Sequence, residues 1–357
     1  MVTRLLTNTI VMIKPLDEGA MAQARARQDR LTKPKGSLGR LEELSIQLAG
    51  IQAKPIPQIK NKAIITMAAD HGVVAHGVST YPQAVTAQMV DNFLRGGAGI
   101  NVIARQINAR IIVVDMGVAS ELKPHPRLLS RKIALGTRDM SSGPAMSQNK
   151  AVRAIESGIE VVSAELTKGL DIVGTGDMGI GNTTASSAIC AVMTGRPAAE
   201  VTGRGTGITD EQLTHKVAVV NKALTVNHPD PAQPLEVLVK VGGFEIGGLA
   251  GVMLAAAAHR IPVVIDGFIS GAAALIATAL SPGLRDFIIA AHLSAEAGHR
   301  LLLKHLGLKP LLELDMRLGE GTGAALGIFL CETAARVLAE MSTFGEAGVS
   351  ERSELLS

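Results

Sequence analysis

The sequence predicts a three-layer α/β protein, in which helices cover both faces of a mostly parallel, Rossmann-like sheet and a small all-helical domain is added. Short, continuously apolar runs alternate with segments of helical periodicity, and each run ends in a polar or glycine-rich turn. Apolar runs of this kind are typical of strands buried on both faces, as in parallel sheets. The first part of the chain shows helical spacing alone, which predicts the helical domain.

Six apolar runs are the predicted strands. They cover residues 63–69, 110–114, 133–135, 170–173, 261–265 and 287–291. In parallel sheets, ligands bind outside the carboxyl ends of the strands. The polar residues at these ends are therefore candidates to line one cleft: Asp70, Asp115, Asp177, Asp266 and His292. The commoner role of an Asp after a strand is to cap the next helix, and both interpretations stay open.

The periodicity also suggests how the chain is divided. We expect residues 1–60 to form the small helical domain, joined by part of the C-terminal helices. Residues 61–345 would form the α/β domain that holds the site. The polar, glycine-containing residues 346–357 would be a flexible tail.

Composition excludes several classes of protein. Only 2% of the residues are aromatic, so platforms for stacking single-stranded nucleic acid are nearly absent. Lys and Arg number 35 against 32 Asp and Glu, with no long basic run. That balance argues against a nucleic-acid partner and suits a small anionic ligand.

The cysteines and the apolar runs indicate where in the cell the protein is located and whether it spans a membrane. Cys190 and Cys331 lack metal or redox spacing, which favours a reduced, cytoplasmic location. The apolar runs 246–258 and 267–280 are shorter than the roughly 20 residues of a spanning helix, so we expect buried helices and no membrane span. The N-terminus shows no secretory signal. Low charge and apolar helices favour a homodimer.

The strongest local signal is the glycine-rich segment 171–185. A predicted strand runs into four glycines and then into a small-residue helix, with Asn182 or Thr183 as its cap. Glycines let the backbone approach an anion and free N–H groups at a helix start point toward it, so Gly179 to Gly181 should bind phosphate. The segment also contains G-x-G-x-x-G. The acidic residue that dinucleotide sites place about 20 positions later is not convincing, because Glu200 lies in a Pro/Ala-rich connection.

A second glycine-rich turn, residues 202–208, precedes a helix that carries Lys216. Two such turns with one Lys could hold a phosphate from two sides, which makes Gly205 and Lys216 candidates. A surface position remains the default for any Lys. Ser294 follows the last predicted strand and could bind a ribose hydroxyl.

Near the C-terminus, a turn between glycines displays one carboxylate, Glu320. Gly319 and Gly321 clear space for a ligand, and a helix is expected over 324–341. A catalytic base would be presented in this way. The alternative is a Glu in the first helical turn that suits the helix dipole.

One tyrosine and two histidines are the remaining candidates for ligand or metal binding. Tyr81 is the only Tyr, and with Gln88 on the following helix it could hold a planar aromatic ligand, although a lone Tyr is more often a packing residue. His71 and His76 invite a metal interpretation. No Cys or carboxylate set completes such a site in the sequence, so we expect no metal.

Taken together, these motifs resemble the nicotinate-nucleotide:dimethylbenzimidazole phosphoribosyltransferases, which make the α-ribazole phosphate of the cobalamin lower loop. The matching stretches run from residues 29–39 (DRLTKPKGSLG) to residues 317–326 (RLGEGTGAAL), so they cover nearly the whole chain. The resemblance implies a glycosyltransferase, more narrowly a pentosyltransferase. Its substrates would be nicotinate mononucleotide and 5,6-dimethylbenzimidazole, with no cofactor and no metal.

The resemblance also implies roles for individual residues. Glu320 would be the general base that takes the N–H proton of the incoming ring, and partial burial would raise its pKa. The benzimidazole pocket would comprise Ser79, Tyr81, Gln88 and Leu318. The nucleotide and its phosphate would be bound by Asp177, Gly179, Gly181, Asn182, Thr183, Gly205, Lys216 and Ser294. Attack opposite the leaving nicotinate would invert C1′.

Asp177 departs from the family pattern, which commonly has Glu before Met-Gly-Ile-Gly-Asn-Thr-Thr. Asp is one methylene shorter, so the departure leaves an auxiliary acid/base role for Asp177 open, whereas a polar contact with the nucleotide carries over.

Two other functions fit parts of the sequence. A nicotinamide-dependent oxidoreductase would account for the G-x-G-x-x-G of residues 174–179, but it leaves the Glu320 turn unexplained. A protein that sequesters a nucleotide or a benzimidazole would bind tightly without turnover.

Overall fold

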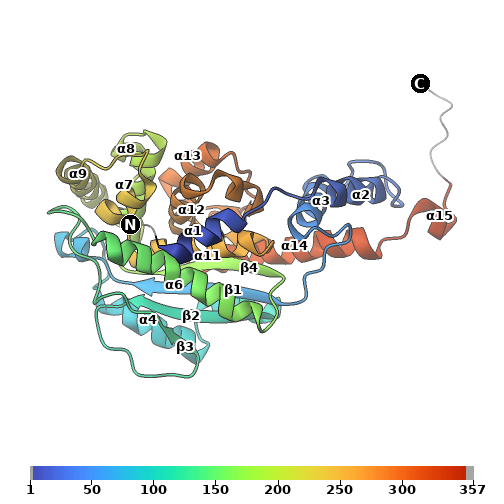
Figure 1. The fold of residues 1–357 in the computed structure, drawn as a ribbon. Helices are drawn as coiled ribbons and strands as arrows, with labels where there is room; N and C mark the ends of the chain where they lie inside the picture. The colour runs from blue at the N-terminus through green and yellow to red at the C-terminus, as the bar shows by residue number, and fades with distance from the viewer. Residues whose placement is uncertain (1–2, 351–357) are drawn as a thin grey trace.

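The computed structural model describes residues 3–350 and confirms the predicted α/β fold (Figure 1). Six parallel strands form the sheet in the order β3-β2-β1-β4-β5-β6. The order reverses between β1 and β4, as in doubly wound nucleotide-binding sheets. The strands are β1 Lys62–Ala69, β2 Ala109–Gly117, β3 Leu128–Ser130, β4 Ile172–Met178, β5 Val263–Ile265 and β6 Ile288–Ala290. A separate short parallel pair joins β7 His292–Leu293 to β8 Leu312–Glu313.

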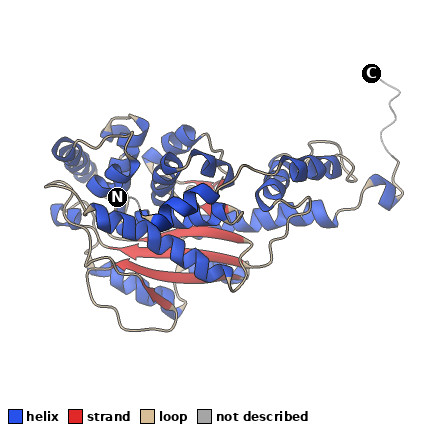
Figure 2. Ribbon diagram, viewed as in Figure 1, coloured by secondary structure: helices blue, strands red, loops and turns tan. Residues whose placement is uncertain are grey.

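Helices cover both faces of the sheet (Figure 2), and buried side chains form a separate hydrophobic core on each face. Successive side chains of β1 point to opposite faces, so Ile65 and Met67 join one core while Ile64 and Ala68 join the other. The first core includes residues of α1 Arg4–Met12, α6 Gln148–Leu166, α7 Asn182–Thr194, α8 Ala198–Val201, α9 Asp210–Asn227, α10 Pro234–Val241, α11 Phe244–Ala258, α12 Phe268–Leu280 and α13 Ala297–Leu306. The second includes residues of α4 Ala84–Arg95, α5 Gly99–Gln106 and α14 Thr322–Glu340. Two 3₁₀ turns lie at Gly72–His76 and Pro282–Phe287.

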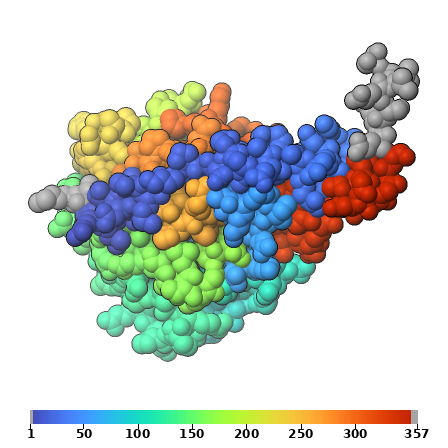
Figure 3. Space-filling model, turned by 45° about the vertical axis from the view of Figure 1, so that its right-hand side comes forward, coloured from blue at the N-terminus to red at the C-terminus, as the bar shows by residue number. Residues whose placement is uncertain are grey.

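Segments from the two ends of the chain meet in a helical region, as the predicted fold class requires (Figure 3). α2 Glu18–Gln28 and α3 Arg40–Gln52 pack against the second half of α14 through Ala24, Ala49 and Leu338. α15 Phe344–Ala347 follows. The boundaries at residues 60 and 345 remain predictions. Of the predicted tail, residues 351–357 lie outside the described part of the chain.

One predicted strand was misplaced and another was predicted too short. Residues 133–135 are not a strand, and the edge strand is β3, five residues earlier. Ile133 still donates a backbone hydrogen bond to Met116, but no ladder continues there. The strand predicted over 170–173 extends to Met178, because Gly174 and Gly176 belong to β4 and not to a loop.

The predicted buried helices are confirmed. α11 and α12 cover the apolar runs and are almost entirely buried. Among the described residues, α14 alone has the length and composition to cross a membrane, yet more than half of its apolar window is buried within the protein, as in a core helix. Cys190 and Cys331 are free thiols, and burial raises the pKa of each to about 12.

The crossing of α6 and α11 depends on glycine. A Cβ at Gly158 would lie 2.0 Å from the carbonyl oxygen of Gly248. We expect Gly158→Ala to lower the free energy of unfolding by about 1–3 kcal/mol, because the backbones cannot approach as closely. Chemical denaturation measures this. The matched control is Gly283→Ala, whose Cβ would meet nothing within 4 Å. Equal stability of the two variants would contradict the prediction.

Candidate functional site

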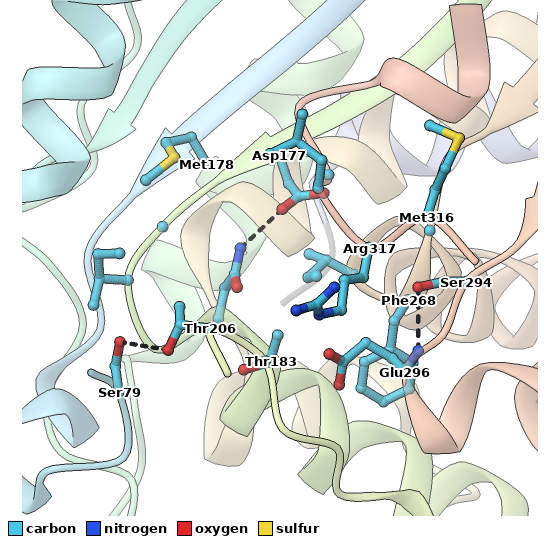
Figure 4. A pocket seen from close by; sticks show the side chains of 18 of the residues that line it. Ser79, Asp177, Met178, Thr183, Thr206, Phe268, Ser294, Glu296, Met316 and Arg317 are labelled. Carbon is cyan, nitrogen blue, oxygen red and sulfur yellow. Dashed lines mark hydrogen bonds between the residues drawn. The ribbon is translucent and has the colours of Figure 1, made fainter. Parts of the chain in front are cut away.

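A cavity of about 540 Å³ opens at the carboxyl ends of β1 and β4, where the strand order reverses (Figure 4). Its lining includes most of the residues predicted for the site, from segments far apart in the sequence. These are Ser79, Tyr81, Asp177, Gly179, Gly181, Asn182, Thr183, Gly205, Ser294 and Leu318. Three predicted residues do not line it: Gln88, Lys216 and Glu320. Gln88 lies on an exposed face of α4, whereas Lys216 and Glu320 are buried.

Of the residues predicted at the ends of the strands, some line the cavity and others do not. Asp177 and His292 line the cavity, whereas Asp70 and Asp115 do not. The Asp115 carboxylate accepts from the N–H groups of Gly117 and Val118, and that of Asp70 accepts from Ala119. Both therefore hold the loop after β2, and neither caps the next helix.

The start of α7 forms one wall of the cavity. Gly181, at φ +91°, is the N-cap of this helix, in place of the predicted Asn182 or Thr183. A Cβ at Gly179 would lie 2.3 Å from the carbonyl oxygen of Ala69, so the turn passes very close to the end of β1. The first turn of α7 thus presents N–H groups and the positive end of the helix dipole to the cavity.

Lys216 lies beneath this wall. It is 1% exposed, and its Nζ donates to Thr183 Oγ1 at 2.8 Å and to the Gly203 carbonyl at 3.2 Å. Burial lowers the pKa of Lys216 to about 8, against the opposing effect of Glu296. Gly205, at φ +51°, leaves room here, because a Cβ would lie 2.9 Å from Thr183 Oγ1. A buried cation beside a helix start can hold a tetrahedral oxyanion.

Glu320 adopts a left-handed conformation, at φ +66°, between Gly319 and Gly321. This backbone is costly for a non-glycine residue, so neighbouring segments must hold it. Thr66 Oγ1 donates to the Glu320 carbonyl at 3.0 Å, and the Glu320 N–H donates to the Asp177 carbonyl at 3.2 Å. The structure therefore fixes Glu320 to the ends of β1 and β4.

Asp266 supports the same turn from the other side. Its carboxylate accepts from the Gly321 N–H at 3.2 Å and from the Ala324 N–H at 3.0 Å. Burial raises the pKa of Asp266 to about 7. Asp266 caps α14, a helix distant in sequence, and not the helix that follows it.

The Glu320 side chain is not part of α14, which begins after it at Thr322. Its Oε2 accepts instead from the N–H of Ile100, in the first turn of α5, at 3.1 Å. Oε1 accepts no hydrogen bond within residues 3–350. Burial raises the pKa of Glu320 above its ordinary value, against the opposing Ile100 bond, in the predicted direction. A carboxylate whose pKa is raised accepts a proton more readily than an ordinary Glu, as a general base must.

Asp177 reaches the cavity from the end of β4. Its Oδ2 accepts from Asn182 Nδ2 at 2.9 Å, and Oδ1 has no partner among the described residues. Burial, with the nearby carboxylates of Asp266 and Glu245, raises the pKa of Asp177 well above its ordinary value. The carboxyl group of Asp177 therefore binds a proton more readily than an ordinary Asp, and in its protonated form it can donate a hydrogen bond to a ligand.

The loop that carries Ser79 and Tyr81 lies against the second glycine-rich turn. Ser79 Oγ and Thr206 Oγ1 are 3.3 Å apart, and the Thr80 N–H donates to Thr206 Oγ1 at 3.2 Å. Tyr81 and Leu318 are both more than half exposed at the cavity. Apolar surface at its rim can cover a planar ring.

Three charged residues that line the cavity were not among the predicted site residues: Glu296, Asp315 and Arg317. Glu296 Oε2 is buried without a hydrogen-bond partner in the described structure, and a Cβ at Gly203 would lie 2.0 Å from it. Arg317 precedes Glu320 by three residues. The sequence offered one signal for these residues, which is that they lie within a few positions of Ser294 or Glu320.

His71 and His76 pair with carboxylates. His71 Nε2 lies 2.6 Å from Glu245 Oε1 in the interior, and His76 Nε2 lies 2.8 Å from Asp139 Oδ2. Residues 3–350 contain no group of three or more His, Cys, Asp or Glu side chains that could hold a metal ion.

Known proteins match this chain over nearly its full length. A family model described as a phosphoribosyltransferase matches residues 13–349. A Desulforudis audaxviator protein named nicotinate-nucleotide–dimethylbenzimidazole phosphoribosyltransferase is 62% identical over 346 residues, which are 97% of this chain and 98% of that protein. A protein of the same name from a Roseiflexus species is 60% identical over 350 residues, 98% of this chain and 99% of that one. The crystal structure of the Thermus thermophilus protein of that name matches with a TM-score of 0.90 at 48% identity, covering 94% of this chain and all of that one.

Proposed function

This chain belongs to the phosphoribosyltransferase family, as a pentosyltransferase, and we propose that it moves the 5-phosphoribosyl group of nicotinate mononucleotide to 5,6-dimethylbenzimidazole. The products are α-ribazole 5′-phosphate and nicotinate. One observation carries the mechanism: Glu320, buried and with a raised pKa, is fixed beside a cavity that also contains an oxyanion site.

In the proposed reaction, a nitrogen of the benzimidazole forms a bond to C1′ as the bond from C1′ to the pyridinium nitrogen breaks. The bonding electron pair returns to the pyridine ring, which leaves without needing an acid. The N–H proton of the benzimidazole passes to Glu320. Attack opposite the leaving ring inverts C1′ and gives the α-riboside, and alignment of the two rings supplies much of the remaining acceleration.

The substrate contacts follow from the same geometry. The first turn of α7, with Gly179, Gly181, Asn182 and Thr183, binds the 5′-phosphate with Lys216 and Gly205. Asp177 and Ser294 contact the nucleotide. Ser79, Tyr81 and Leu318 cover the benzimidazole, and Gln88 stays a predicted contact at the outer edge of this pocket. A cytoplasmic homodimer also remains a proposal.

The competing oxidoreductase loses support from the position of the glycines. Gly174 and Gly176, the first two of the G-x-G-x-x-G, lie inside β4 and not in the turn that would cradle a pyrophosphate. A Cβ at Gly176 would lie 2.2 Å from the Glu320 carbonyl oxygen, so packing of the turn accounts for this glycine.

Chromatography of nicotinate mononucleotide incubated with 5,6-dimethylbenzimidazole tests the reaction. We expect nicotinate and a ribazole phosphate in equal amounts. Tight binding of both substrates without either product would instead favour the sequestering protein, and a spectral change with a reduced nicotinamide cofactor would favour the oxidoreductase.

The pH dependence of kcat/KM should be bell-shaped. A general base acts only when deprotonated, so activity falls as pH drops through the raised pKa of Glu320, at a higher pH than for an ordinary Glu. Lys216 binds phosphate only when protonated, so activity falls again as pH rises above about 8. Steady-state rates across pH measure both limbs. An alkaline limb that persists unchanged in Lys216→Met would contradict the second assignment.

A further inference from the structure

Arg317 is the only Lys or Arg among the residues that line the cavity. Figure 4 shows its side chain reaching into the cavity between Asp177 and Glu296. No hydrogen bond or ion pair joins its guanidinium to another described residue. Among the other charged residues that line the cavity, Asp177 and Glu296 are buried, and the exposed Asp315 also has no partner in the described structure. Its backbone is held in place, because the neighbouring Met316 carbonyl accepts from the Ala295 N–H at 3.1 Å.

The cavity is lined by carboxylates, so an unpaired guanidinium within it can attract an anionic ligand. The carboxyl groups of Glu296 and Asp315 line it, and Glu320 lies just behind Gly319. An anionic ligand would be repelled from this side unless a cation faced it. Lys216 cannot serve there, since its Nζ is fixed below Thr183 and Gly203.

The proposed donor carries two anionic groups, the 5′-phosphate and the carboxylate of the pyridine ring. The start of α7 and Lys216 already supply the phosphate site. Arg317 belongs to the segment that leads into Glu320, so it stands on the side of the reacting rings. The planar fork of a guanidinium matches a carboxylate with two parallel hydrogen bonds.

We propose that Arg317 binds the carboxylate of the nicotinate ring and thereby selects nicotinate mononucleotide over nicotinamide mononucleotide. This assignment rests on the proposed function for its substrate. The amide differs from the acid in one neutral group, so the unpaired guanidinium would gain no charge-assisted bond from it. Hydrogen bonds to charged groups account for about 10- to 100-fold in affinity.

Calorimetry without the acceptor base tests the proposal directly. The parent should bind nicotinate mononucleotide at least about 10-fold more tightly than nicotinamide mononucleotide, and Arg317→Met should abolish this preference by weakening the first alone. Arg317→Lys, which keeps the charge but not the fork, should retain part of it. Arg336→Met, a change at an exposed arginine on α14, is the matched control and should behave as the parent.

Other outcomes would overturn the assignment. Equal weakening of both nucleotides in Arg317→Met would mean that Arg317 binds the phosphate, and no weakening would leave it a solvated surface charge. Thermal unfolding of each variant identifies a folding defect. If Arg317→Met proves to be misfolded, the nucleotide preference of Arg317→Lys tests the assignment in its place. Because binding is measured without turnover, loss of the preference in a protein that forms no ribazole phosphate would refute the proposed function and still support the carboxylate site.

Discussion

Replacing Glu320 by Gln is expected to lower kcat by about 100- to 10,000-fold, the usual contribution of a general base. Gln keeps the size of the side chain and an oxygen that can accept from the Ile100 N–H, so the left-handed turn should persist. The variant loses only the ability to take a proton from the benzimidazole. Product formation under saturating substrates measures the loss, and nucleotide affinity should change little, since Glu320 does not contact the phosphate site.

Glu340→Gln is the matched control for this experiment. Glu340 is the last residue of α14 and pairs with Arg336 at the surface, far along the helix from the cavity. Its replacement should leave turnover within about twofold of the parent. If Glu320→Gln also turned over at the parental rate, the reaction could stand but Glu320 would lose its role as base.

Gly176→Ala is expected to have the second large effect, through the backbone of the same turn. The added Cβ would lie 2.2 Å from the Glu320 carbonyl oxygen and 2.8 Å from the Gly321 nitrogen, and neither is a flexible side chain. The turn must therefore move away from β4, which weakens the Thr66 bond to Glu320. A displacement of about 1 Å at a catalytic group can cost 100-fold in rate, so we expect at least that loss.

Stability should fall along with activity in Gly176→Ala, by about 1–3 kcal/mol for an overpacked contact. The comparison is Gly345→Ala, which meets nothing within 4 Å in α15. Thermal unfolding and turnover together check the prediction. A variant with parental turnover would show that the position of Glu320 does not depend on the close approach of β4.

Most of the sheet was predictable from the sequence, because β1, β2, β5 and β6 contain continuous apolar runs that are largely buried. The edge strand β3 was not, since Leu128 and Leu129 are only partly buried, Ser130 is exposed, and no longer apolar run marks the strand. β4 was cut short for a different reason. Gly174 and Gly176 interrupt the apolar pattern, and their purpose is tertiary: they admit Ile64, Ala324 and the Glu320 turn, which lie far away in the sequence.

In the candidate site, too, some features could be predicted from the local sequence and others depend on tertiary packing. Glycine-rich turns and the display of Glu320 could be found locally, because they depend on the conformations that glycine allows. The burial of Lys216 could not, since it depends on how α9 packs beneath the start of α7. The partner of Glu320 is the start of α5, and no spacing in the sequence connects Ile100 with Glu320.

A direct displacement at C1′ determines the anomeric configuration of the product, so this configuration is the measurement to make on the proposed reaction. The ribazole phosphate formed from nicotinate mononucleotide and 5,6-dimethylbenzimidazole would be isolated and its C1′ configuration assigned by NMR. We expect the α-anomer alone, because the benzimidazole attacks opposite the departing nicotinate. A β-anomer, or a mixture of both, would contradict in-line attack and require an intermediate that the proposed mechanism does not contain.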